Sequence, residues 1–127
     1  MASFIICVWL SIIAVHDRRT GRIANGAVWP GVLAPVAMAT HDPAVLASAG
    51  VAALPYLFAA VAGLGGGGDI KLAFALGGLL ADPTLALLVV LTAAILGAAG
   101  HAFTCSRGPR PHAPALVAAG ICGLAVT

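Results

Sequence analysis

Six apolar stretches cover most of this 127-residue chain, and this pattern limits what the chain can fold into. The stretches are Ala2–Val15, Gly26–Thr40, Ala44–Leu64, Ile70–Ala81, Thr84–Phe103 and Ala113–Thr127. Hydrophobic residues make up 61% of the chain and charged residues 8%, whereas soluble domains have about 25% charged residues. One soluble core of this size could not bury so much apolar surface. We therefore predict an all-α, polytopic integral membrane protein with about six transmembrane helices in a single domain over residues 1–127.

The charged residues lie between these stretches or at their edges, and the basic ones follow a regular order. Three arginines follow the first stretch, Lys71 lies at the start of the fourth, and two arginines follow the fifth: Arg18, Arg19, Arg22, Arg107 and Arg110. If all six stretches cross the membrane, all six bases lie on one side. The positive-inside rule then places that side in the cytoplasm and both termini outside. A net charge of +2 is too small to indicate a nucleic-acid partner.

Four acidic residues are candidates for chemistry, and two of them have a simple structural explanation. Asp42 and Asp82 each precede a proline, which is typical of a residue that caps the next helix. Asp17 and Asp69 come from distant parts of the chain, yet the predicted topology places both at the cytoplasmic ends of apolar segments. The cysteines and histidines are scattered and form no metal-ligand motif, so we expect no metal site.

Asp69 follows a run of four glycines, Gly65 to Gly68, which removes side-chain bulk and permits backbone angles closed to other residues. Two facing carboxyl groups can share one proton, so that one activates water while the other hydrogen-bonds a substrate carbonyl. That is the chemistry of an aspartyl protease. Alternatively, Asp69 only caps a helix, and Asp17 is an interfacial residue paired with Arg18 or Arg19.

The sequence around these two residues resembles a known family, the type IV prepilin peptidases, which are membrane aspartyl proteases with a G-x-G-D motif. The segment Gly66-Gly67-Gly68-Asp69-Ile70-Lys71-Leu72 is close to the family's G-x-G-D-x-K-L. The segment from His16 to Asn25 is similar to the family's element of Asp, basic residues and Ile-Pro-Asn, with Ala24 in place of the proline. Pro111 to Leu116 resembles the proline-marked entry to the last helix.

The resemblance implies that Asp17 and Asp69 are the catalytic pair and that Gly66 and Gly68 shape the substrate loop. Lys71 and Asn25 would orient the site, or else they are a snorkelling lysine and a loop-capping asparagine. The substrate would be a prepilin or pseudopilin, whose leader is cut at the cytoplasmic face of a bacterial or archaeal inner membrane. Pilus or secretion assembly proteins would be further partners, and no cofactor is required.

The chain also departs from the longer members of that family. They carry an N-terminal cytoplasmic region, often with paired C-x-x-C motifs, that is associated with N-methylation of the product. The chain resembles the short peptidase-core form, so methylation with S-adenosylmethionine is not expected. Two other functions stay open: a catalytically inactive membrane assembly factor for pili or secretion, and a small proton-coupled transporter.

Overall fold

The computed structural model describes residues 2–63, 66–104 and 113–126, and these residues form six α-helices and no β-strand. This confirms the prediction of an all-helical chain with six segments. The helices are α1 (Ala2–Thr20), α2 (Asn25–Met38), α3 (Pro43–Val61), α4 (Gly67–Leu80), α5 (Pro83–Thr104) and α6 (Ala113–Val126). Arg107, Arg110 and the Pro111-His112 pair lie outside the described residues, so their predicted places remain predictions.

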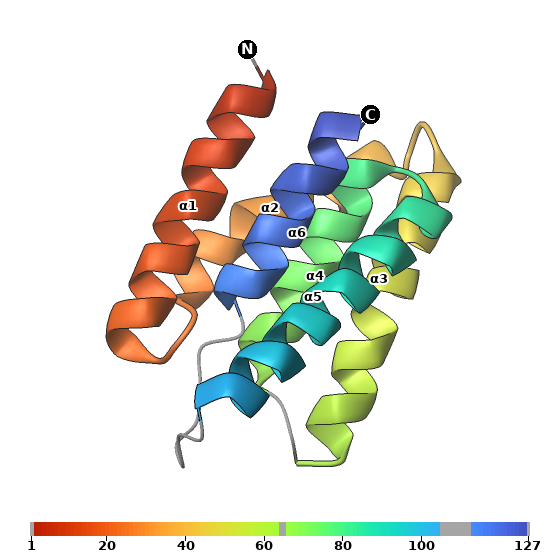
Figure 1. Ribbon diagram of the computed structural model, residues 1–127. Coiled ribbons are helices and arrows are strands. Elements are labelled where there is room, and N and C mark those ends of the chain that lie inside the picture. Colours follow the sequence, from red (N-terminus) through yellow and green to blue (C-terminus); the bar gives the residue numbers. More distant parts are fainter. Residues whose placement is uncertain (1, 64–65, 105–112, 127) are drawn as a thin grey trace.

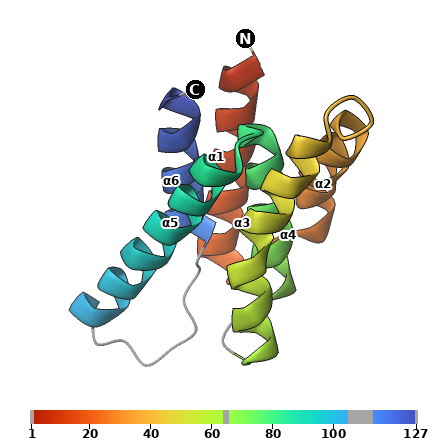
Figure 2. The same ribbon diagram turned by 90° about the vertical axis from the view of Figure 1, so that its right-hand side faces the viewer.

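Successive helices run in alternating directions, so the chain crosses the molecule from end to end six times (Figures 1 and 2). The C-terminal ends of α1, α3 and α5 lie at the lower end in Figure 1, together with the N-terminal ends of α2 and α4. Both chain termini lie at the opposite end. The structure thus places the segments that carry Asp17 and Asp69 at the same end of the molecule.

Only one of the described helices is both long and apolar enough to cross a membrane by itself. This is α3, whose 19 residues have a mean hydropathy of 2.0. Shorter apolar segments occur in α5 (Pro83–Ala99) and α6 (Pro114–Ala125). Helices α2 and α4 have 14 residues each, which corresponds to about 21 Å at 1.5 Å per residue.

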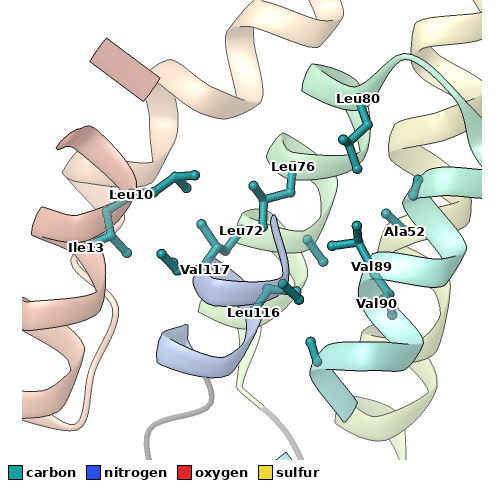
Figure 3. Packing of buried hydrophobic residues seen from close by; sticks show 14 of the residues in the cluster. Leu10, Ile13, Ala52, Leu72, Leu76, Leu80, Val89, Val90, Leu116 and Val117 are labelled. Atoms are coloured by element: carbon teal, nitrogen blue, oxygen red, sulfur yellow. The ribbon is translucent and has the colours of Figure 1, made fainter. Parts of the chain in front are cut away.

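Helix α4 lies at the centre of the packing and contacts α2, α3, α5 and α6. Its leucines Leu72, Leu76 and Leu80 recur every four residues and line one face of the helix, where they are buried (Figure 3). Around them lie residues of the other five helices, so one apolar cluster joins all six: Leu10, Ile13, Val28, Ala52, Val89, Val90, Leu116 and Val117.

Glycines on α4 allow its neighbours to approach closely. A Cβ atom added to Gly77 would lie 2.6 Å from the backbone oxygen of Ser48 on α3. The Ser48 hydroxyl is buried and donates a hydrogen bond to the Gly77 carbonyl oxygen at 2.6 Å. The next residue, Gly78, points about 100° further around the helix and leaves room for the Pro35 ring of α2. Small residues at such crossings are typical of helices packed in lipid.

We predict that Gly77→Ala destabilises the protein because α3 and α4 must separate to admit the methyl group. The expected cost is about 1–3 kcal/mol, the usual range for overpacking. Gly50→Ala is the matched control, since Gly50 lies within α3 and a Cβ there meets nothing within 4 Å. That variant should gain up to about 1 kcal/mol from helix propensity. Unfolding of both variants in the same detergent measures the difference, and equal effects would contradict the close approach of α3 and α4.

Candidate active site

Asp17 lies in the last turn of α1 on the face that packs into the protein. Asp17 is only 3% exposed, and its spacing of four and seven residues from the buried Ile13 and Leu10 places it on the same helix face. The neighbouring Arg18 and Arg19 are exposed and lie at the C-terminal end of the helix, where positive charge is favourable. The helical period therefore separates the carboxyl group from the adjacent cations and turns it inward.

The turn after α1 leads the chain back toward the protein. Gly21 has a φ of +63°, and its N–H donates to the Asp17 carbonyl oxygen at 2.7 Å. This is a left-handed C-terminal cap, a conformation that glycine adopts without steric cost. The Thr20 hydroxyl bonds the carbonyl oxygens of His16 and Arg22 at 2.8 and 2.9 Å. The first helix thus runs five residues beyond the predicted limit of Val15.

Asp69 lies in the first turn of α4 and is 9% exposed. Its backbone N–H donates to the Gly66 carbonyl oxygen at 3.2 Å, and Gly66 is the N-terminal capping residue of the helix. A carboxylate near a helix N-terminus is stabilised by the helix dipole. Asp and Glu side chains are mostly exposed in folded proteins, so two buried aspartates in one short chain are unusual.

The structure describes three of the four glycines before Asp69, since Gly65 lies outside the described residues, and Gly68 supports the predicted removal of side-chain bulk. Gly66, Gly67 and Gly68 all have negative φ, and the last two are helical. Their role as suppliers of unusual backbone angles is therefore not supported. Gly68 instead provides a close contact: a Cβ added there would lie 2.8 Å from the Ile23 Cβ, whereas Gly66 and Gly67 face open space. The segment after Asp17 thus packs directly against the segment that bears Asp69.

Lys71 and Asn25 meet across these two segments. The Lys71 ammonium donates to the Asn25 side-chain oxygen at 3.0 Å and lies 5.6 Å from the centre of the Trp29 ring. Asn25 is the first residue of α2, whose capping residue is Ala24. The asparagine therefore accepts a bond from α4 and does not cap its own helix. Ala24 has a φ of −65°, the angle that a proline would impose, so the backbone here is compatible with the proline of the family motif.

Asp42 and Asp82 lie at the other end of the molecule and cap helices, as predicted. An Asp42 side-chain oxygen accepts from the Ala44 N–H at 2.9 Å at the start of α3. An Asp82 side-chain oxygen accepts from the Thr84 and Leu85 N–H groups at 2.7 and 3.0 Å at the start of α5. Each of these carboxylates satisfies helix N–H groups that would otherwise lack a partner.

Two aromatic residues near the candidate site have no counterpart in the sequence motifs. Tyr56 on α3 is partly buried against the apolar cluster and interacts electrostatically with the Asp69 carboxylate. Trp29 stacks on Lys71. Trp29 lies four residues after Asn25 and so shares its helix face. This spacing is visible in the sequence and could have indicated that Trp29 lies near Asn25. The proximity of Tyr56 depends on how α3 crosses α4, and no local pattern shows it.

An open hollow of about 520 Å³ lies along α1, but neither candidate aspartate lines it. Its described lining residues occupy the face of α1 away from Asp17: Cys7, Val8, Ser11, Ile12, Val15, His16 and Arg19. The described residues contain no group of three or more His, Cys, Asp or Glu side chains that could hold a metal ion.

Comparison with known proteins identifies the family of the chain. The model of the type IV leader peptidase family matches residues 4–101, which include both Asp17 and Asp69 and more than half of the chain. No curated protein and no solved structure gives a significant match. The matched region covers the first four helices and most of α5. On this match, the chain belongs to the type IV leader peptidase family.

Proposed function

We propose that the protein is a membrane-embedded aspartyl endopeptidase that removes the leader peptide of prepilins or pseudopilins. The family supports peptidase activity in general. The observation that supports the aspartyl mechanism is the burial of Asp17 and Asp69 at one end of the molecule, on segments that touch through Ile23 and Gly68. Buried carboxyl groups are costly to keep, and such groups concentrate at functional sites.

In the proposed mechanism the two carboxyl groups take different roles. The ionised group draws a proton from a water molecule, and that water attacks the scissile carbonyl carbon. The protonated group donates a hydrogen bond to the carbonyl oxygen and stabilises the charge that develops there. Collapse of the tetrahedral intermediate returns a proton to the leaving amine. Asp17 and Asp69 carry these roles together, with no cofactor.

We further propose that residues 1–127 form one domain that spans the inner membrane six times. Large apolar side chains are exposed on four helices, including Phe4 of α1, Leu33 of α2, Phe58 of α3 and Ile95 of α5, which are 58–73% exposed. Exposed apolar surface of this extent is unfavourable in water and favourable against lipid. Four of the six bases belong to the end that bears Asp17 and Asp69, and the positive-inside rule places that end in the cytoplasm.

The orientation gives a testable prediction. Single cysteines introduced at Arg19 and Gly67, in a background without the native cysteines, should react with a membrane-impermeant maleimide only after the cells are opened. A cysteine at His41, at the opposite end of the helices, should react in intact cells. Labelling of position 19 or 67 from outside would overturn the proposed orientation.

The proposed substrate follows from the position of the site. A prepilin with a short basic leader and a hydrophobic helix would place its helix in the lipid and its leader at the cytoplasmic end, beside the two aspartates. Pilus or secretion proteins that receive the mature pilin would be the downstream partners.

Co-expression with candidate prepilins tests the function. Cleavage removes the leader, so the pilin band should migrate faster when the wild-type protein is present. If the pilin stays intact yet co-purifies with the protein, the inactive assembly factor becomes the better account. If neither cleavage nor binding occurs and the protein acidifies proteoliposomes, the proton-coupled transporter becomes the better account.

A further inference from the structure

Lys71 of α4 links this helix to α2 near the candidate site. Lys71 bonds Asn25 at 3.0 Å and stacks on Trp29 at 5.6 Å. Asn25 and Trp29 are four residues apart on α2 and lie on one helix face. A charged donor forms a stronger hydrogen bond than a neutral one, and a cation over a tryptophan ring adds a second attraction. One side chain of α4 therefore holds the first turn and a half of α2.

Helix α2 is held on its other side by α1. The Trp9 indole N–H donates to the Ala27 carbonyl oxygen at 2.8 Å. The ring of Trp9 also fills the space beside Gly31, where any side chain would overlap it. The N-terminal half of α2 thus bridges the helix that carries Asp17 and the helix that carries Asp69.

Lys71 and Asp69 project from different sides of α4. Residues two positions apart in a helix do not face each other, and Lys71 extends toward α2. Lys71 can therefore influence the two aspartates through the bridge that α2 forms between their helices.

We propose that Lys71 is a positioning residue. By binding Asn25 and Trp29 it fixes the position of α2, and α2 in turn fixes α1 through Trp9. Asp17 then keeps its position relative to Asp69. This inference rests on the proposed aspartyl mechanism. A misplacement of about 1 Å between catalytic groups can reduce a rate roughly 100-fold, so a tether of this kind has a large effect without touching the substrate.

Kinetics with a cognate prepilin test the proposal. Lys71→Met keeps the chain length and removes the charge and the donor, and we expect kcat to fall roughly 10- to 100-fold with KM within about twofold. Lys71→Arg retains a cation and donors and should stay within about threefold of wild type in kcat. Asn25→Asp keeps the acceptor and should remain active, whereas Asn25→Leu should behave as Lys71→Met does.

The double variant separates positioning from direct action. If Lys71 acts through Asn25, then Lys71→Met with Asn25→Leu should lose no more than the worse single variant. If Asn25→Leu had the wild-type kcat while Lys71→Met were inactive, the proposal would be overturned, since Lys71 would then act without Asn25. A rise in KM alone would also overturn it, because it would make Lys71 a substrate-binding residue.

A second measurement does not depend on cleavage. Cysteines at Ile23 and Gly68, in a background without the native cysteines, would have Cβ atoms about 2.8 Å apart in the present packing, so the two segments must separate slightly to reach the 3.5–4.5 Å of a disulfide. Cleavage is therefore measured separately, in protein that keeps Gly68. We expect oxidative crosslinking to be several-fold slower when Lys71→Met is added. If crosslinking depends on Lys71 but no prepilin is cut, the tether stands and the peptidase proposal fails. If prepilin is cut and crosslinking is unchanged by Lys71→Met, the tether is wrong.

Discussion

Asp17→Asn and Asp69→Asn are each expected to abolish prepilin cleavage. The proposed mechanism needs one carboxylate that takes a proton from water and one carboxylic acid that polarises the carbonyl, and asparagine, although it can donate a hydrogen bond, cannot take up or release a proton. General acid–base catalysis contributes roughly 10²–10⁴-fold per group, so each variant should lose at least that factor in kcat. The double variant should lose little more than either single one, because groups that act as a unit are not additive.

Asp42→Asn and Asp82→Asn are the matched controls for this series. All four substitutions remove one negative charge from the same chain, so a general effect of charge would appear in all of them. Asn is about as good as Asp as a helix-capping residue, so the caps of α3 and α5 should persist. Both controls should therefore cleave prepilin at close to the wild-type rate. Loss of cleavage in all four variants would point to a defect in folding.

Gly68→Val is the second variant with a large expected effect. The added side chain must occupy space that Ile23 now fills, since a Cβ at position 68 would already lie 2.8 Å from the Ile23 Cβ. The segment after Asp17 and the start of α4 would be forced apart, and cleavage should be lost while membrane insertion is retained. A displacement of about 1 Å at the site accounts for a roughly 100-fold loss.

Gly67→Val tests whether the position of the glycine matters. It makes the same substitution one residue earlier, where a Cβ meets nothing within 4 Å. Cleavage by Gly67→Val should stay within about tenfold of wild type, since the side chain meets no neighbour there and valine has a higher helix propensity than glycine. Equal losses in the two variants would mean that the glycines serve as a flexible connector and that the contact with Ile23 is unimportant.

The parts of the fold that depend on local sequence could be predicted. Six apolar runs predict six helices, and the Asp-Pro pairs predict the caps at Asp42 and Asp82. Helix α1 continues beyond Val15, where the apolar stretch stops, through Asp17 to Thr20. Arginines near the end of a helix and a glycine just beyond it are ordinary stop signals, so Gly21 marks this end in the sequence.

The contacts between distant segments could not be predicted in the same way. The motifs indicate that Gly68, Lys71 and Asn25 matter, but a local pattern does not say what each touches. Gly68 was expected to remove side-chain bulk and to free the backbone, but the sequence did not show that Ile23 is the residue for which it makes room. Lys71 and Asn25 are 46 residues apart and meet only because α2 and α4 pack together. Such contacts arise from tertiary packing, which the period of a single helix does not encode.

The most direct test of the account is cleavage of a purified cognate prepilin by the purified protein in detergent, followed by mass spectrometry of the products. Two peptides should appear, the leader and the mature pilin, whose masses sum to that of the prepilin plus one water. Neither should appear with Asp69→Asn prepared in the same way. Intact prepilin with the wild-type protein, or the same two products at the wild-type rate with Asp69→Asn, would contradict the two-aspartate peptidase.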